Sequence, residues 1–395
     1  MTGPWWTLAV TLAIQSLVSM AVITVPVMAP ALAAALSVSP TLVGLYIATI
    51  YAAAMLASLV GGAAVARFGA IRVSQACVVL CAMGLAVSAL PFVAAAAAGA
   101  LLIGLGYGPI TPASSHLLAR STPAHRMSLV FSIKQTGVPL GGVLAGAFVP
   151  VLLGWGWQAA LLCVAVANLL CGLLGQPLRQ ELDADRDPQR RMALGNLAQP
   201  IRLVLGHPDL RRLAACSFVF SIAQLSLTTY LVTYLHSTLE YGLVAAGLAL
   251  SISQFAGVGG RVAWGYVADR WLGARRMLAL LAVLMALSAL ATALLQPAMQ
   301  PALVLAVLAL YGMSGIGWNG VYLAEVARRA PPGQASLATG GTLAFTFFGV
   351  VLGPPLFGAL AGATGSYRAG FVAVAVAVAL CVPVMARGVR WRSGG

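Results

Sequence analysis

The sequence predicts an all-α polytopic membrane protein with twelve transmembrane helices, arranged as two six-helix bundles related by pseudo-symmetry. Three observations predict this class. Of the 395 residues 61% are hydrophobic and only 8% are charged, whereas a soluble domain has about a quarter of its residues charged. Long uncharged runs separate the charged residues, and the second half of the chain repeats features of the first. The alternating ten-residue segments of a membrane β-barrel do not occur in the sequence.

The uncharged runs give the number of spans, because one spanning helix takes about 20 apolar residues. Residues 213–239 and 241–260 each hold one span, the second extending toward Asp269. Two spans fit into each of the runs 1–66, 73–119, 135–178, 277–324 and 330–386, of which the last is interrupted by Arg368. Together these runs hold the twelve predicted spans.

The arginines predict the orientation, because Lys and Arg accumulate in short cytoplasmic loops. Nineteen arginines fall on one side of the predicted membrane, and Arg368 alone falls on the other. The nineteen are Arg67, Arg72, Arg120, Arg126, Arg179, Arg186, Arg190, Arg191, Arg202, Arg211, Arg212, Arg270, Arg275, Arg276, Arg328, Arg329, Arg387, Arg390 and Arg392. We therefore expect both termini in the cytoplasm and the chain in a bacterial inner membrane. The net charge of +14 is then a topology signal and calls for no nucleic-acid partner.

One long polar segment divides the chain into an N-terminal six-helix bundle (1–176), a cytoplasmic central loop (177–209) and a C-terminal bundle with a short cytoplasmic tail (210–395). We expect the central loop to be a solvated linker. The two halves share glycines and arginines at similar offsets, as transporter folds often do. The matches are Gly62 and Arg67 with Gly265 and Arg270, Gly106 and Gly108 with Gly315 and Gly317, and GVPLGG (137–142) with GVVLGP (349–354).

These features resemble the major facilitator superfamily along nearly the whole chain. The resemblance lies in the six-plus-six layout and in the loop motif formed by Gly265, Asp269, Arg270, Arg275 and Arg276. It implies that this loop, with its first copy at Gly62 and Arg67, acts as a latch between helix ends during alternating access. Two departures stand out. The first copy has Ala66 where the family has an aspartate, and the second copy has one extra residue before Gly273.

Two cations lie inside predicted spans. Lys134, the only lysine of the chain, is eight residues beyond Arg126, and Arg261 is eight residues before Asp269, so each lies about 12 Å into its helix. The resemblance implies that spans 5 and 8 face one cavity. Ionisable groups within a membrane are costly, and no acidic residue lies within the first 180 residues. An anion is therefore the natural partner. The alternative is that either side chain reaches the cytoplasmic interface or bonds backbone carbonyls.

The stretch GGRVAWGYVADR (259–270) carries a second resemblance, to oxalate–formate antiporters and monocarboxylate transporters. In those families an arginine four residues before a glycine of the eighth helix binds the substrate carboxylate, and Arg261 and Gly265 occupy these positions. The planar fork of arginine suits a carboxylate. The second cation that the oxalate transporter carries in its eleventh helix has no counterpart here, which disfavours a dicarboxylate.

Polar side chains on plausible cavity faces complete the predicted substrate site, with interhelical hydrogen bonding as the alternative role. They are Gln15, Gln135, Gln224, Thr228, Gln254, Asn319 and Tyr322. Near Lys134, we expect Pro139 to kink span 5 and the glycines that follow to allow close helix packing. His116 and Glu325 lie at helix ends, where we expect contacts with nearby arginines, Arg120 for His116 and Arg328 and Arg329 for Glu325.

We therefore predict a secondary transporter that moves a small organic anion, with a monocarboxylate as the leading candidate. Coupling is either to protons or to exchange of a second anion. The alternative within transport is an exporter of drugs or hydrophobic compounds, although the lack of acidic residues in the spans disfavours cationic cargo. A non-transporting membrane receptor is the alternative from another class. We expect neither an enzyme nor a bound metal or other cofactor, and a monomer whose only other contacts are with membrane lipid.

Overall fold

The computed structural model describes residues 4–121, 130, 133–189, 198–331 and 334–386 of the chain. Within these ranges twelve helices are long and apolar enough to cross a membrane, and no strand occurs. The predicted class and number of spans are thereby confirmed. The predicted loop residues Arg126, Arg190, Arg191, Arg387, Arg390 and Arg392 lie outside the described residues.

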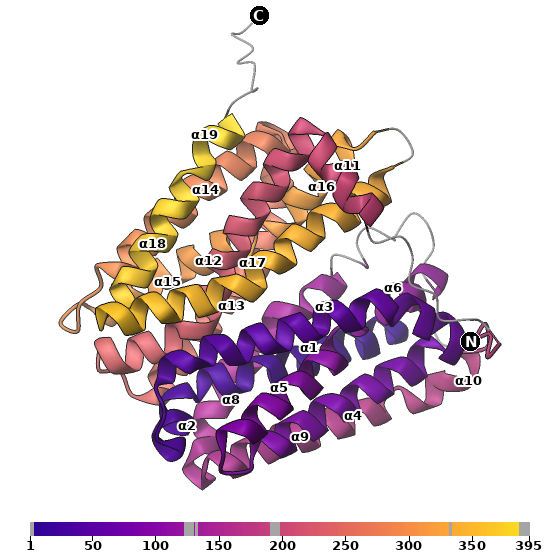
Figure 1. Cartoon of the computed structure of the whole chain (residues 1–395), viewed down its shortest axis with the longest axis horizontal. Coiled ribbons are helices and arrows are strands. Elements are labelled where there is room, and N and C mark those ends of the chain that lie inside the picture. The colour runs from indigo at the N-terminus through magenta and orange to yellow at the C-terminus, as the bar shows by residue number, and fades with distance from the viewer. Residues whose placement is uncertain (1–3, 122–129, 131–132, 190–197, 332–333, 387–395) are drawn as a thin grey trace, which may run out of the picture. The chain divides into compact units, whose positions relative to one another are not determined.

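The chain forms two compact units (Figure 1). Unit 1 comprises residues 1–195 and 228–251, and unit 2 comprises residues 196–227 and 252–395. The helices α12 (Pro208–Thr238) and α13 (Leu243–Val267) are divided between the units. The bundle boundaries at 176 and 210 follow the sequence repeat instead and stay a prediction.

Unit 1 holds the first six spans. Its helices are α1 (Pro4–Val27), α2 (Ala29–Leu36), η1 (Pro40–Leu42), α3 (Val43–Phe68), α4 (Ala70–Ser88), α5 (Val93–Tyr107), α6 (Ile110–Ser121), α8 (Gly137–Leu152), η3 (Leu153–Trp155), α9 (Trp157–Leu173), η4 (Gln176–Leu178) and α10 (Arg179–Leu182). The helix α4 packs between α5 and α9, and α1 packs along α8 (Figure 1).

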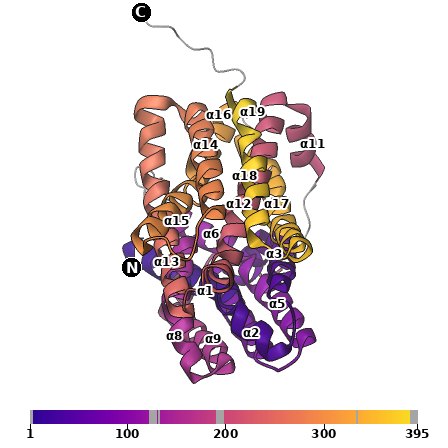
Figure 2. The same cartoon turned by 90° about the vertical axis from the view of Figure 1, so that its left-hand side faces the viewer.

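Unit 2 holds the later spans. Besides parts of α12 and α13 it contains α11 (Ala198–Gly206), the π-helical turn η5 (Ala268–Leu272), α14 (Ala274–Ala293), α15 (Pro301–Gly315), α16 (Asn319–Arg329), α17 (Ala335–Thr364), α18 (Tyr367–Ala379) and α19 (Cys381–Ala386). The helix α14 packs against α15 and α18, and α17 lies beside α18 (Figure 2).

Spans 4 and 10 are each broken at the glycines that the repeat pairs. In span 4, α5 ends at Tyr107 and α6 begins at Ile110. In span 10, α15 ends at Gly315 and α16 begins at Asn319. At membrane depth such a break is tolerated only where protein or a cavity covers the backbone, so both breaks mark the interior of the protein.

Span 5 is interrupted beside Lys134. Residues 133–135 are helical, Thr136 forms a turn, and α8 begins at Gly137. Pro139 has no N–H and therefore cannot donate to the carbonyl of Gln135, four residues back. This accounts for the predicted interruption of the helix.

The predicted close packing of span 5 is confirmed at Gly141, because a Cβ there would lie 2.7 Å from the backbone nitrogen of Met20 on α1. Its repeat counterpart Gly353 on α17 approaches α12 in unit 2, where a Cβ would lie 2.9 Å from Cα of Ile222. The repeated glycines thus make equivalent helix contacts in the two halves.

The extra residue before Gly273 is accommodated in η5. The N–H of Gly273 donates to the carbonyl of Ala268, five residues back, at 2.8 Å. A π-helical turn takes up one inserted residue in this way, so α14 begins with the same glycine-initiated geometry as α4, at Gly273 (φ 74°) and Gly69 (φ 96°).

The central polar segment is not simply a solvated linker, which corrects the expectation from sequence. Asp183 is buried against the first turn of α4, where its carboxylate accepts from the N–H of Ile71 at 2.7 Å and of Arg72 at 3.1 Å. Asp185 lies 2.7 Å from Nε2 of His116, so His116 makes a helix-end contact with an aspartate of this segment, where a contact with an arginine was expected. These carboxylates fasten the segment to unit 1.

Candidate functional site

The group around Lys134 lies in unit 1. Lys134 is only 1% exposed, and its Nζ donates to Oε1 of Gln135 at 3.4 Å. An ammonium group so deeply buried needs polar surroundings, because burying an unpaired charge is costly. In this structure the side chain does not extend to the surface, which is the alternative that the sequence left open.

Gln15 on α1 lies beside this group. A Cβ on Gly137, three residues after Lys134, would lie 2.9 Å from Cβ of Gln15. The amide of Gln15 donates to Oγ of Ser19 at 3.3 Å, while its Oε1 is buried and accepts no hydrogen bond from the described residues. A buried acceptor without a donor is uncommon, and it makes this position suited to a polar ligand.

The group around Arg261 lies in unit 2, at the break of span 10. Nε of Arg261 donates to the carbonyl of Ile316 at 3.2 Å, and Nδ2 of Asn319 lies 3.4 Å from the same oxygen. The break between α15 and α16 exposes this carbonyl to side chains. The alternative of backbone bonding therefore holds for Nε of the guanidinium group.

Gln224 on α12 joins the Arg261 group. Its Oε1 accepts from Nδ2 of Asn319 at 3.3 Å and from Nε1 of Trp318 at 3.0 Å. Three residues singled out from sequence, on three different helices, are thus connected through the broken span. Trp318 was missed, although a tryptophan beside Gly317 in the middle of a span indicates an indole N–H that needs an acceptor.

Three other predicted substrate residues are placed less directly. Tyr322 is buried, and its hydroxyl donates to Oγ of Ser217 at 3.0 Å, which is the interhelical bond expected as the alternative. Thr228 and Gln254 are also buried. Gln254 lies two helical turns before Arg261 on α13, on the same face of the helix.

The predicted latch residues divide between the units. In unit 1, the guanidinium of Arg67 lies 5.2 Å from the ring of Phe68, and a Cβ on Gly62 would meet no described atom within 4 Å. In unit 2, Asp269 pairs with Arg328 at 3.4 Å, and both are exposed. Arg275 pairs with Asp209 at 3.7 Å and donates to the carbonyl of Met385 at 3.0 Å. Asp269 thus pairs outside its own loop motif. The latch roles of Gly265, Arg270 and Arg276 stay predictions.

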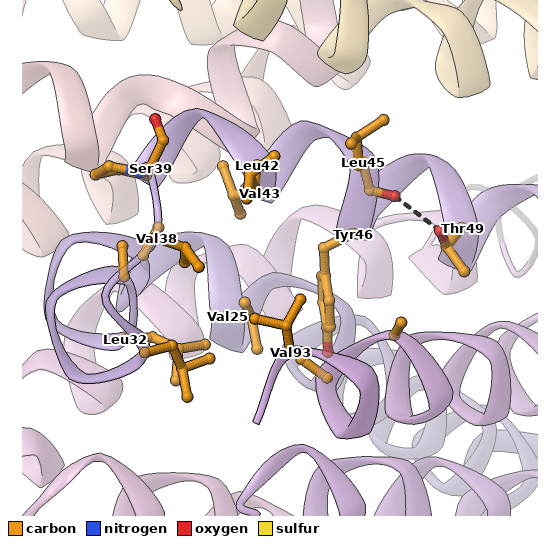
Figure 3. A pocket seen from close by; sticks show the side chains of 16 residues that line it. Val25, Leu32, Val38, Ser39, Leu42, Val43, Leu45, Tyr46, Thr49 and Val93 are labelled. Atoms are coloured by element: carbon orange, nitrogen blue, oxygen red, sulfur yellow. Dashed lines mark hydrogen bonds between the residues drawn. The ribbon is translucent and has the colours of Figure 1, made fainter. Parts of the chain in front are cut away.

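An apolar cavity of about 250 Å³ lies in unit 1, and neither Lys134 nor Arg261 is among the residues that line it. Side chains of α1, α2, α3 and α5 surround it, with Val25, Leu32 and Val93 among them (Figure 3). Tyr46 stands along one wall, and the hydroxyl of Thr49 bonds the carbonyl of Leu45 at 2.8 Å (Figure 3). None of the predicted substrate residues lines this cavity, so it is distinct from the candidate anion site.

Lys134 and Arg261 belong to different units. The shared cavity that the sequence predicts for them stays a prediction. Among the described residues, no group of three or more His, Cys, Asp or Glu side chains is placed to hold a metal ion.

Residues 11–342 match the Major Facilitator Superfamily. Monocarboxylate transporter 11 of Mus musculus is 29% identical, over 80% of this chain and 72% of that protein. An uncharacterized MFS-type transporter of Mycobacterium tuberculosis is 26% identical over 71% of this chain, and a chloroplastic sodium-dependent phosphate transport protein of Arabidopsis thaliana is 27% identical over 57%. The matches span only 62% and 45% of the length of the latter two proteins.

Solved structures show the same fold. A bacterial homologue of the human lysosomal transporter Spinster superposes with a TM-score of 0.79 at 14% identity, covering 98% of this chain and 97% of that one. A D-xylose–proton symporter superposes with a TM-score of 0.76 at 16% identity, covering 97% of each chain.

Proposed function

Because the chain belongs to the Major Facilitator Superfamily, we propose that it is a secondary active transporter that moves a small organic anion by alternating access. A monocarboxylate is the substrate that fits best, and the cytoplasmic membrane of a bacterium is the place of action, with both termini inside. The observation that carries the proposal is the position of Arg261 at the break of span 10, held by the carbonyl of Ile316.

Arg261 is the proposed ligand of the carboxylate. Its Nε bond to a neutral carbonyl orients the guanidinium plane without neutralising its charge. A carboxylate can then form two parallel charge-assisted bonds to the guanidinium fork. Gln224 and Asn319, which are already connected at the same break, supply neutral polar groups that can bond the remainder of a small substrate.

Lys134 supplies the second positive charge in this proposal, with Gln15 and Gln135 beside it. Two cations without an anion are unfavourable in a dry cavity, and a bound carboxylate offsets that cost. The empty transporter therefore needs either hydration of the site or a second anion. Cotransport of a proton with a weak acid requires the first, and exchange of one anion for another supplies the second.

Three contacts in unit 1 support alternating access. The hydroxyl of Tyr230 on α12 donates to the carbonyl of Thr41 at 2.9 Å, and Oγ of Ser251 on α13 donates to the carbonyl of Val143 at 2.8 Å. Gly146 on α8 also packs against the carbonyl of Gly247 on α13. In the predicted topology all three contacts lie on the side away from the arginine-rich loops, and we assign them to a closed outer gate.

Export of hydrophobic compounds is the second candidate, favoured by the apolar cavity shown in Figure 3. One experiment separates the two functions. Purified protein in liposomes is given a panel of labelled monocarboxylates, dicarboxylates and a lipophilic dye, with and without a proton gradient. We expect saturable uptake of at least one monocarboxylate and no dye movement. Dye movement without carboxylate transport would establish the second candidate in place of the first.

A further inference from the structure

Gln15 on α1 and Gln224 on α12 occupy related positions in the two halves of the chain. The shift of 209 residues that pairs the glycines of spans 4 and 10 also pairs these two glutamines. Each of them lies in the first span of its half. The repeat therefore predicts similar partners for their amide groups, and the structure shows different ones.

In unit 2 the protein itself satisfies the amide oxygen of Gln224. Its Oε1 accepts from Nε1 of Trp318 at 3.0 Å and from Nδ2 of Asn319 at 3.3 Å. An amide oxygen has two lone pairs, so two donors are what it can take. Both donors come from the break of span 10, where α15 ends at Gly315 and α16 begins at Asn319.

In unit 1 the amide oxygen of Gln15 has no such donors. The shift of 209 residues takes Trp318 and Asn319 to Pro109 and Ile110, whose side chains cannot donate. Oε1 of Gln15 is buried and accepts no hydrogen bond from the described residues. Since Gln15 is only 1% exposed, bulk water does not reach this oxygen in the state that the structure shows. A buried acceptor without a donor costs free energy, so a ligand that brings a donor is favoured here.

A cation lies in the same group of side chains. Gly137 follows Lys134 by three residues, and a Cβ on this glycine would lie 2.9 Å from Cβ of Gln15. The ammonium group of Lys134 donates to Oε1 of Gln135 at 3.4 Å, so the second glutamine of the group already has a donor. The Lys134 group thus combines a positive charge with the unused acceptor of Gln15.

These two features together restrict the ligand. A carboxylate has only acceptors, so it suits the cation and not the oxygen of Gln15. An ammonium group could donate to Gln15, but it would add a second positive charge beside Lys134, and no acidic residue occurs within the first 180 residues to offset it. A neutral hydroxyl group donates without adding charge. The ligand that fits both features carries a carboxylate and a hydroxyl group.

We propose that Gln15 accepts a hydrogen bond from a hydroxyl group of the transported anion, and that the substrate is therefore a hydroxy monocarboxylate. This inference rests on the proposed function, in which Arg261 and Lys134 attract the carboxylate. A site that bonds a substrate hydroxyl leaves a buried group unpaired when an analogue without the hydroxyl binds, and so selects against that analogue. Because Gln15 is closed off from solvent in this state, the substrate binds in a state in which alternating access has opened the site.

The test compares short monocarboxylates of one chain length, namely the unsubstituted acid, its hydroxy isomers and the matching oxo acids. Each acid is titrated into the purified full-length protein in detergent, and the rise in Tm gives an apparent Kd. At least one hydroxy acid should bind about tenfold more tightly than the unsubstituted acid, the factor expected for one hydrogen bond. The matching oxo acid should show no such gain, because a keto oxygen cannot donate.

Three variants locate this preference. Gln15→Met removes the acceptor and keeps the length of the side chain, so the hydroxy acid should lose its tenfold advantage while the unsubstituted acid binds as before. Gln15→Glu keeps an acceptor oxygen, so the ratio of the two Kd values should persist even though the added negative charge weakens binding of every acid. Gln224→Met is the matched control, because it removes an oxygen that Trp318 and Asn319 already occupy, and the ratio should stay as in the wild type.

The outcomes separate this inference from the proposed function. Equal binding of the hydroxy acids and of the unsubstituted or oxo acids by the wild type would overturn the inference and leave anion transport standing. An unchanged ratio in a folded Gln15→Met variant would do the same. Binding of none of the acids would overturn both. The wild-type ratios are decisive by themselves, so the test does not depend on whether Gln15→Met folds.

Discussion

The surroundings of Lys134 and Arg261 differ, although both cations lie inside membrane spans. Lys134 is almost fully buried, and a neighbouring glutamine side chain lies 3.4 Å from its ammonium group. Arg261 is only half-buried and is oriented by a backbone carbonyl freed at a helix break. A flexible ammonium acts as a point charge, whereas an oriented guanidinium presents a fixed fork. The comparison supports the proposal that Arg261 binds the carboxylate and that Lys134 contributes charge.

We expect the largest effect on uptake from a substitution that removes the planar guanidinium group of Arg261 but keeps the positive charge. Arg261→Lys removes both the bond to Ile316 and the bidentate geometry. Two charge-assisted bonds of about 1.5 kcal/mol each correspond to a loss of roughly a hundredfold in uptake efficiency. Initial rates in proteoliposomes measure it.

Arg368→Gln is the matched control, because Arg368 also donates to a backbone carbonyl, that of Leu295 at 2.9 Å, but at the far end of span 12. Its uptake should equal that of the wild type. Wild-type rates for Arg261→Lys would show that charge alone suffices and would remove the distinction between the two cations.

A smaller effect is expected at Lys134. Lys134→Ala removes the ammonium charge together with its bond to Gln135, so KM for the anion should rise about tenfold, as expected for the loss of one charge-assisted contact to the substrate. The concentration dependence of uptake gives KM and the maximal rate separately. An unchanged KM would exclude Lys134 from the anion site and leave the burial of its ammonium group without a functional account.

The outer gate allows a third comparison, between the Tyr230 side chain with and without the hydroxyl group that bonds the carbonyl of Thr41. Tyr230→Phe removes one hydrogen bond worth about 1 kcal/mol and keeps the ring in place. We expect the gate to open more often, which a cysteine-reactive probe applied from outside to Thr41→Cys should detect as faster labelling. Equal labelling rates with and without the hydroxyl would contradict the gate assignment.

The smallest differences concern stability, and they compare the two latch regions. Asp183→Asn weakens a buried cap that serves two N–H groups, and loss of such a cap costs about 1 kcal/mol. Asp269→Asn breaks an exposed pair, which contributes about 0.5 kcal/mol or less. Thermal unfolding in detergent should therefore show a lower Tm for Asp183→Asn than for Asp269→Asn. The reverse order would mean that the central segment is not fastened by Asp183.

The sequence predicted two kinds of feature: those that repeat in both halves of the chain, and those whose misplacement in the membrane costs free energy. Charge-free runs located the twelve spans, because a charge inside lipid is expensive. The repeated glycines of spans 5 and 11 indicated the close contacts at Gly141 and Gly353, whereas the breaks at the paired glycines of spans 4 and 10 were not predicted. The extra residue before Gly273 could be recognised in the sequence as a departure from the family spacing. Only the structure shows that a π-helical turn accommodates it.

Other contacts could not be predicted, because nothing in the sequence distinguishes the residues involved from others of the same type. Every residue has a carbonyl, so nothing in the sequence distinguishes that of Ile316 as the partner of Arg261. Asp183 is one of several acidic residues in a polar segment, and its role depends on a fold that brings it to Ile71 and Arg72 across more than a hundred residues. Gln224 and Asn319 were recognised as polar groups. That Gln224 accepts from both Asn319 and Trp318 depends on the break between α15 and α16.

Equilibrium binding tests the central claim, that Arg261 holds the carboxylate, most directly. The best-transported monocarboxylate is titrated by calorimetry into detergent-purified wild type, Arg261→Gln and Arg368→Gln, with Tm recorded for each protein. Arg261→Gln should bind about a hundredfold more weakly, while Arg368→Gln should bind as the wild type does. A folded Arg261→Gln variant that binds the anion within twofold of the wild type would contradict the account.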